Sequence, residues 1–190
     1  MDPNAQLKIS SRLESGESLI WAGVPRQGLL LRASDTFMIP FSLLWGGFAI
    51  FWELGVISTD APFFFMLWGI PFVLVGLYMI VGRFFVDARV RGNTFYGLTD
   101  RRAIIVSGIF NMSTKSLPLR TLTDISLTER NDGSGNVLLG RQQPFASWYA
   151  GMQWPGMGQH LAPGFELIEN AKLVHDQLIE AQSVSGRGHS

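Results

Sequence analysis

The chain has 190 residues, no cysteine, and equal numbers of basic and acidic side chains, so its formal net charge is zero. The lack of cysteine excludes disulfides and thiolate metal sites. Hydrophobic residues make up 47% of the sequence and charged residues 16%, a composition more typical of a membrane protein than of an ordinary soluble domain.

Residues 1–35 form a mixed N-terminal segment with weak patterning. Leu13 to Gly16 indicates the end of a short helix or a turn. Ser18 to Gly23 is apolar enough for a strand, and Pro25 then interrupts it. No cleavable signal peptide is expected, because the first long apolar run begins only at Thr36.

Two long uncharged runs follow, from Thr36 to Trp52 and from Ala61 to Gly82. A helix rises ~1.5 Å per residue, so the second run spans ~33 Å, enough for the hydrocarbon core of a bilayer. The first reaches full length if Glu53 lies at the headgroup level and the helix continues to Ile57. Core helices of soluble proteins rarely run this far without a charge. Residues 36–82 therefore predict a membrane hairpin with two helical spans.

The charges around the hairpin predict its orientation. The loop from Glu53 to Asp60 holds two acids and no base, whereas basic residues flank both outer ends: Arg26, Arg32, Arg83, Arg89 and Arg91. By the positive-inside rule, we expect a multi-pass protein of the inner (cytoplasmic) membrane with both termini cytoplasmic.

Aromatic and small residues complete the hairpin pattern. Trp52 and Tyr78 lie near span ends, where such side chains favour the membrane interface. Small residues occur in pairs on each span, and they predict that the two helices pack closely: Ser42 with Gly46, and Gly69 with Gly76.

After the hairpin the hydrophobic period changes to two, which predicts strands. The expected strands are Thr94 to Leu98, Ala103 to Ser107, Lys115 to Leu119, Thr123 to Thr128 and Val137 to Leu139. Pro118 marks an edge strand, and the run from Asn131 to Asn136 marks a hairpin turn. The pattern predicts an antiparallel meander of at least five strands.

The C-terminal part departs from both periods before a helix begins. Residues 145–157 form a loop rich in aromatic side chains, including Trp148 and Trp154, and two burial sites stay open for it: the end of the domain or the membrane interface. Phe165 to Ile168 adds a short strand. Glu169 to Gln182 has the spacing of an amphipathic helix, and residues 183–190 are expected to form a flexible tail.

No set of residues with catalytic or metal-binding spacing emerges. The three histidines fall on a loop, a helix and a tail, without the spacing of metal ligands. A basic set remains as the candidate ligand-binding site, because turn and strand-end positions could gather its side chains on one rim: Arg101, Arg102, Lys115 and Arg120. A solvated surface that obeys the positive-inside bias is the simpler interpretation of these charges.

The order of the elements resembles that of bacterial membrane-anchored pleckstrin-homology (PH) domain proteins of the YdbS/YdbT-like type. The residues that carry the resemblance are GESLIWAGVPRQG before the hairpin, and FYGLTDRRAIIVSG, SLPLRTLTDISL, NDGSG and FELIENAKLVHDQLIEAQ after it. The resemblance implies a β-rich PH-like barrel, residues 83–182, closed by the C-terminal helix at the cytoplasmic membrane face.

We expect a non-enzymatic, membrane-anchored module without cofactor or metal, which recruits or assembles a protein or peptide partner. Anionic-lipid sensing by the basic set and a small transporter or channel component stay open as alternatives. A transporter would show polar or charged groups within its spans, and these spans offer few. The bilayer itself is a partner, a homo-oligomer is compatible with the sequence, and nucleic acid is not expected because the basic charge is modest.

Overall fold

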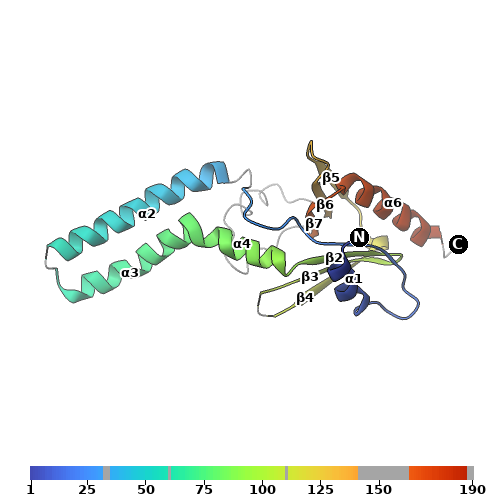
Figure 1. The fold of residues 1–190 in the computed structure, drawn as a ribbon, viewed down its shortest axis with the longest axis horizontal. Helices are drawn as coiled ribbons and strands as arrows, with labels where there is room; N and C mark the ends of the chain where they lie inside the picture. The colour runs from blue at the N-terminus through green and yellow to red at the C-terminus, as the bar shows by residue number, and fades with distance from the viewer. Residues whose placement is uncertain (32–34, 60, 110, 141–162, 188–190) are drawn as a thin grey trace. The chain divides into compact units, whose positions relative to one another are not determined.

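The computed structural model describes residues 1–31, 35–59, 61–109, 111–140 and 163–187, which form two compact units (Figure 1). Of the described residues, the first unit, here called the sheet unit, combines those within 1–28, 89–140 and 163–187. The second, the hairpin unit, contains those within 29–88. Because residues on both sides of the hairpin belong to the sheet unit, the hairpin is an insertion into the sequence of that unit.

The hairpin unit consists of two long apolar helices and a short charged helix whose last residues, 89–92, belong to the sheet unit. Helix α2 spans Asp35–Ser58, α3 spans Phe63–Leu77, a π-helical turn η1 covers Tyr78–Gly82, and α4 spans Arg83–Gly92. The helix beyond Glu53 that the first span needs for full length is confirmed. Most of the large hydrophobic side chains of α2 and α3 are exposed.

Small residues bring α2 and α3 together, as predicted. The buried positions of α2 include Ser42, Gly46 and Ala49, and those of α3 are Gly69 and Gly76. A Cβ atom added to Gly76 would lie 2.8 Å from the Cα atom of Gly46. The two backbones therefore approach closely at this glycine pair, and the contact leaves no room for a side chain.

The sheet unit begins with helix α1, Pro3–Ser10. The Asp2 carboxylate caps it by accepting a 2.9 Å hydrogen bond from the Ala5 N–H, and Pro3 follows at the first helical position. This N-cap and proline pattern predicts a helix start from sequence. We assigned only Leu13 to Gly16 to the end of a helix or a turn, and thus missed α1.

Within the described residues, seven antiparallel strands form two sheets. Sheet A has the order β1-β2-β3-β4, with strands Leu19–Gly23, Phe95–Thr99, Arg102–Ser107 and Ser113–Pro118. Sheet B has the order β5-β6-β7, with strands Ile125–Glu129, Gly135–Leu139 and Gly164–Ile168. Every predicted strand is present, and β4 is an edge strand as its proline indicated.

The predicted barrel is wrong, because neither sheet closes on itself in the part of the chain that the structure describes. β4 ends at Pro118, which has no N–H for a further ladder bond, and the 3-10 turn η2 at Leu119–Thr121 then leads the chain into sheet B. Nor is the meander continuous along the chain. β1 comes from the segment before the hairpin and pairs with β2 after it, so residues 1–35 contribute a strand and a helix to the sheet unit.

The main core lies between the two sheets and helix α6, Ala171–Arg187. α6 contributes Ala171, Val174, Leu178 and Ala181, the spacing that predicted an amphipathic helix. A smaller core on the other face of sheet A joins Ile9 of α1 to Ile104 and Val106 of β3. The helix extends to Arg187, further than the predicted end at Gln182.

Valine at Gly76 tests the helix contact. The larger side chain must push α2 and α3 apart, and overpacking of this kind typically costs about 1–3 kcal/mol. We expect Gly76→Val to lower the unfolding midpoint of the purified protein in detergent, measured by tryptophan fluorescence. Gly47→Val on α2 is the matched control, because nothing lies within 4 Å of a Cβ there. Equal midpoints for the two variants would contradict the close contact.

Candidate functional site

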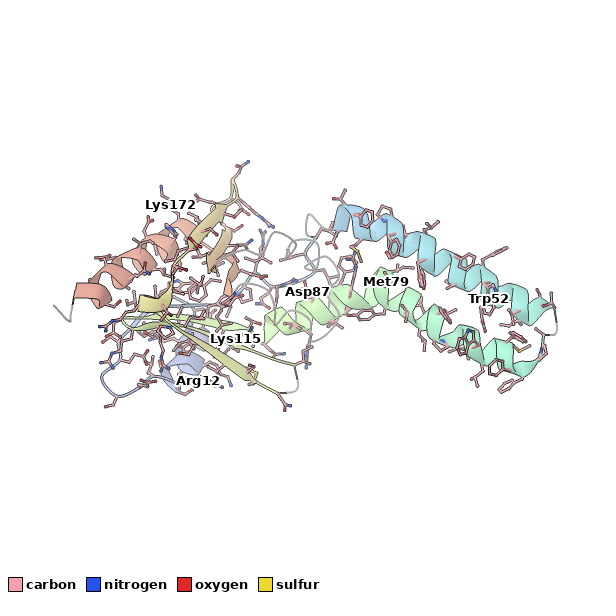
Figure 2. The ribbon with its side chains drawn as sticks, turned by 180° about the vertical axis from the view of Figure 1, so that it is seen from behind. Arg12, Trp52, Met79, Asp87, Lys115 and Lys172 are labelled. Carbon is pink, nitrogen blue, oxygen red and sulfur yellow. The ribbon has the colours of Figure 1, made fainter. Side chains whose placement is uncertain are left out.

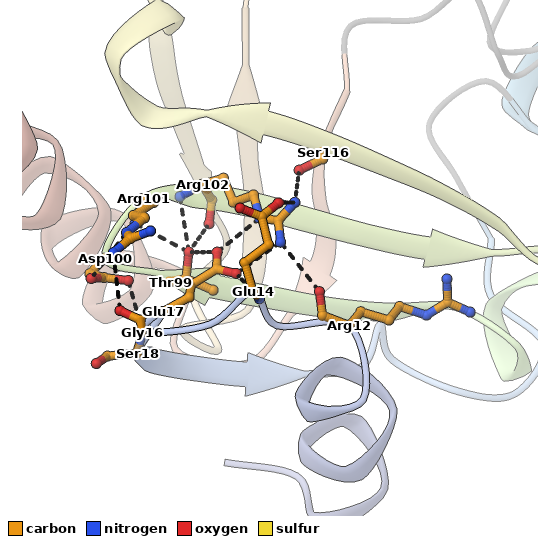
Figure 3. Close-up of polar contacts among 10 residues, drawn as sticks. All are labelled: Arg12, Glu14, Gly16, Glu17, Ser18, Thr99, Asp100, Arg101, Arg102 and Ser116. Carbon is orange, nitrogen blue, oxygen red and sulfur yellow. Dashed lines mark hydrogen bonds and ion pairs between the residues drawn. The ribbon is translucent and has the colours of Figure 1, made fainter.

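The β2–β3 turn holds the most developed polar cluster among the described residues, and it joins the segment before the hairpin to the strands after it (Figure 3). Arg102 donates to both carboxylate oxygens of Glu17, from Nε and from Nη2, each at 2.8 Å. Its Nη1 lies 2.9 Å from a Glu14 carboxylate oxygen and donates to Ser116 Oγ at 3.1 Å. A two-pronged arginine–carboxylate pair of this kind is directional as well as strong.

Glu17 is the buried member of the pair, since its side chain is 0% exposed. The Thr99 hydroxyl donates to it at 2.7 Å, and the Glu14 N–H donates at 2.8 Å. The hydrogen bonds from Arg102, aided by those from Glu14 and Thr99, outweigh burial and lower the pKa of Glu17 from 4.5 to about 2. Glu17 is therefore charged at neutral pH although it lies away from water.

The same turn is fastened by its other two residues. The Ser18 N–H donates to the Asp100 carboxylate at 2.9 Å, and Arg101 Nη2 donates to the Gly16 carbonyl at 3.2 Å. Consecutive residues of the turn between β2 and β3 thus bind the segment from Gly16 to Ser18 through hydrogen bonds and an ion pair. Sequence analysis missed Glu17, because a single acid in a weakly patterned segment carries no signal of its partner.

A second tether joins the two flanks at Arg91. This buried side chain donates from Nε to the Arg26 carbonyl at 3.2 Å and from Nη2 to the Gly28 carbonyl. The Arg26 N–H in turn donates to the Leu167 carbonyl of β7 at 2.8 Å. The chain that enters the hairpin is therefore held by the chain that leaves it.

The predicted basic set does not form one rim. Arg102 shares the α1 face of sheet A with Ile104, whereas Lys115 is paired with Ile105 and lies on the opposite face (Figure 2). Arg101 is half-exposed at the turn, and Arg120 is exposed on η2. Arg102 is fully engaged within the chain, so its role here is to hold the fold rather than to display charge.

The four aromatic residues predicted at the membrane interface fall into two groups. Trp52 lies near the C-terminal end of α2, with its ring against Gly69 of α3 (Figure 2). Tyr78 begins the π-helical turn and is half-buried. Trp148 and Trp154, with the rest of the loop 145–157, lie outside the described residues.

An ion pair lies at the open end of the hairpin unit. Arg83 Nη1 of α4 is 2.7 Å from the Asp35 carboxylate at the first residue of α2, and both side chains are largely buried. The Arg83 guanidinium also lies over the Phe84 ring, 4.5 Å from its centroid. Asp35 and Arg83 lie at the two ends of the apolar hairpin sequence, and their ion pair joins the start of α2 to the start of α4. In the described part of the chain, acidic and histidine side chains form no group that could hold a metal ion.

Replacing Glu17 by glutamine tests the first tether. The lowered pKa of Glu17 means that its stabilisation is complete above pH 4.5 and is lost as the pH falls towards about 2. This lowering of the pKa sets an upper limit of about 3 to 4 kcal/mol on the stabilisation, and screening by solvent reduces it. We expect Glu17→Gln to reduce the free energy of unfolding in urea clearly at pH 7 and much less at pH 3.

The exposed carboxylate Glu169 provides the matched control for this measurement. Glu169→Gln removes one negative charge from the same unit, and we expect it to change the free energy of unfolding by less than about 0.5 kcal/mol at either pH. A Glu17→Gln variant as stable as this control at pH 7 would mean that the pair with Arg102 contributes no net stability.

The sequence was compared with models of known protein families, with curated proteins and with solved structures. The family model described as "Bacterial PH domain" matches residues 44–160, which cover most of the hairpin and the strands β2 to β6. No curated protein and no solved structure matches the chain. The match extends over more than half of the sequence, and its strand region covers β2 to β4 of sheet A and β5 and β6 of sheet B, without β1 and β7. The chain therefore belongs to the bacterial PH domain family.

Proposed function

We propose that this protein is a membrane-anchored interaction module, in which the hairpin spans the bacterial inner membrane and the sheet unit recruits a protein or peptide partner on the cytoplasmic side. Membership of a PH domain family suggests a non-enzymatic interaction module. The membrane role and the partner are our proposal, and the observation that carries it is the exposed apolar surface of the hairpin.

That surface is unlike a soluble core. Only 28% of the most apolar window of Asp35–Ser58, and 11% of that of Phe63–Gly92, is buried. A core helix of a soluble protein is mostly buried, whereas a helix in a bilayer presents such side chains to lipid. Exposed rings such as Phe37, Phe51 and Phe63, all more than 70% accessible, would be costly in water.

The connectivity of the chain indicates that the whole sheet unit lies on one side of the membrane. β1 precedes the hairpin and β2 follows it, yet the two strands are hydrogen-bonded neighbours. Both flanks must therefore lie on the same side of any membrane that the hairpin crosses. The basic residues at these flanks and the acids in the connecting loop favour the cytoplasmic side.

Two observations favour a protein or peptide partner over anionic lipid. The basic set is divided between opposite faces of sheet A, and one of its members, Arg102, is paired with Glu17 and Glu14. A lipid-binding rim needs several cations on one surface, each worth about 1 kcal/mol. An arrangement of this kind offers a lipid fewer aligned charges than the sequence alone indicated.

The orientation can be tested with single cysteines, because the chain has none of its own. Ser58 ends α2 and Ser183 lies on α6, and both are exposed. We expect an impermeant maleimide to label Ser58→Cys in intact cells, and Ser183→Cys only after the inner membrane is permeabilised. Labelling of Ser183→Cys in intact cells would overturn the proposed topology.

Recruitment can be tested by photo-crosslinking in native membranes. A benzoylphenylalanine side chain placed in turn at exposed positions on α1, β4, η2 and α6 samples different surfaces of the sheet unit: Leu7, Ser113, Arg120 and Leu173. A recruiting module should give discrete protein adducts from at least one surface and not from all. Absence of protein adducts at every position would contradict recruitment.

A further inference from the structure

A groove lies between the end of β5 and the outer side of α6. Its cavity measures about 470 Å³, and the side chains that matter for its chemistry are Glu129, Lys172, Leu173, Asp176, Gln177 and Glu180. Leu173 is 53% exposed at this site, and Ile179 and Val184 are also exposed further along α6. The groove thus offers one exposed apolar side chain, Leu173, beside polar groups on the side of α6 that faces away from the core.

The charge of the groove is negative. Three carboxylates line it against one ammonium group, that of Lys172. Asp176 Oδ1 has a close neighbour, His175 Nδ1 at 3.1 Å, and no ion pair to Glu129 or Glu180 occurs among the described residues. A cavity whose lining has one dominant sign concentrates ligands of the opposite sign, here cations.

Gln177 supplies an observation independent of charge. Its amide oxygen is buried, and no hydrogen-bond donor among the described residues reaches it. A buried acceptor without a donor typically costs about 1–3 kcal/mol, and most such groups in proteins are satisfied. A ligand that brings N–H donors into the groove would relieve this cost.

The backbone of β5 is open along one edge. Asp124 accepts from the Gly140 N–H, and Arg130 donates to the Ser134 carbonyl, so the even-numbered residues of this strand face β6. The N–H and C=O groups of Ile125, Leu127 and Glu129 therefore point to the other edge, where no strand is paired in the described part of the chain. Such an edge is a template for an added strand.

We propose that β5 and this groove bind an extended, basic peptide segment of a partner protein, which deepens the proposed function and rests on it. The segment adds to β5 as an antiparallel strand, so its N-terminal end lies next to Glu129 at the mouth of the groove. Basic side chains there meet Glu129, Asp176 and Glu180, and apolar side chains lie against Leu173. Lipid phosphates and nucleic acid would be repelled by the same carboxylates.

The binding test uses the full chain in lipid nanodiscs. The probe is a short fluorescein-labelled peptide of alternating threonine and valine with an arginine pair at its N-terminal end, measured by fluorescence anisotropy. A glutamate pair in place of the arginines should weaken binding at least tenfold, a difference of about 1.4 kcal/mol. Methylation of alternate peptide amides should abolish binding, because it removes the ladder hydrogen bonds.

The double variant Glu129→Lys, Glu180→Lys should weaken binding of the arginine peptide at least tenfold and lower the salt dependence of that binding. Glu169→Lys is the matched control, since this exposed acid lies close in sequence but does not line the groove. Equal affinities for the two variants, or for the arginine and glutamate peptides, would overturn the basic specificity. Unchanged binding of the methylated peptide would overturn strand addition.

Crosslinking from Leu173 separates this proposal from the proposed function. A protein adduct at Leu173 that is lost in the Glu129→Lys, Glu180→Lys variant supports the groove as the recruitment site. Protein adducts from α1, β4 or η2 with none from Leu173 would reject the groove while recruitment stands. An adduct at Leu173 with a second copy of this chain, or with lipid, would replace the proposed occupant, and no adduct anywhere would reject recruitment itself.

Discussion

The pair between Glu17 and Arg102 is the constraint on which the arrangement of the sheet unit depends. It joins residues that lie on opposite sides of a long apolar insertion, through two parallel hydrogen bonds of 2.8 Å to a carboxylate with no exposed side-chain surface. A buried ion pair stabilises a fold only when its remaining hydrogen-bonding capacity is also met. Thr99, Glu14 and Ser116 meet that condition here, so the pair is specific to one arrangement of the flanking segments.

Several contacts hold the two ends of the hairpin close together. Strand β1 and Arg91 hold the two flanks within one folded unit, and the ion pair of Asp35 with Arg83 joins the helices at their ends. Inside the hairpin, Gly46 and Gly76 let the backbones meet without side chains between them. Sheet A cannot be completed until residues on both sides of the insertion are available. In our proposal this couples the folding of the recruiting unit to the insertion of its anchor.

Basic and acidic residues concentrate in different parts of the chain, and this distribution is consistent with the proposed function. Basic residues concentrate directly after the second apolar run, where they suit the cytoplasmic membrane surface. Carboxylates line the groove of α6, where they suit a basic peptide. A module that used both features would keep its partner-binding surface free of anionic headgroups. Electrostatic complementarity of this kind contributes to specificity and association rate more than to affinity.

The sequence by itself determined the strands, the two apolar helices and most of α6, because these depend on local periodicity. Residues close in sequence were enough to predict four features: the two uncharged runs, the alternating strands, the edge strand at Pro118 and the apolar face of α6. Asp2 and Pro3 form the N-cap and first turn of α1, and the sequence analysis did not predict this helix. Only the tertiary structure decided that the sheets stay open, that β1 joins β2, and that Arg102 faces Glu17 while Lys115 lies on the other face. Pairings across such sequence distances depend on register and packing, which no local pattern encodes.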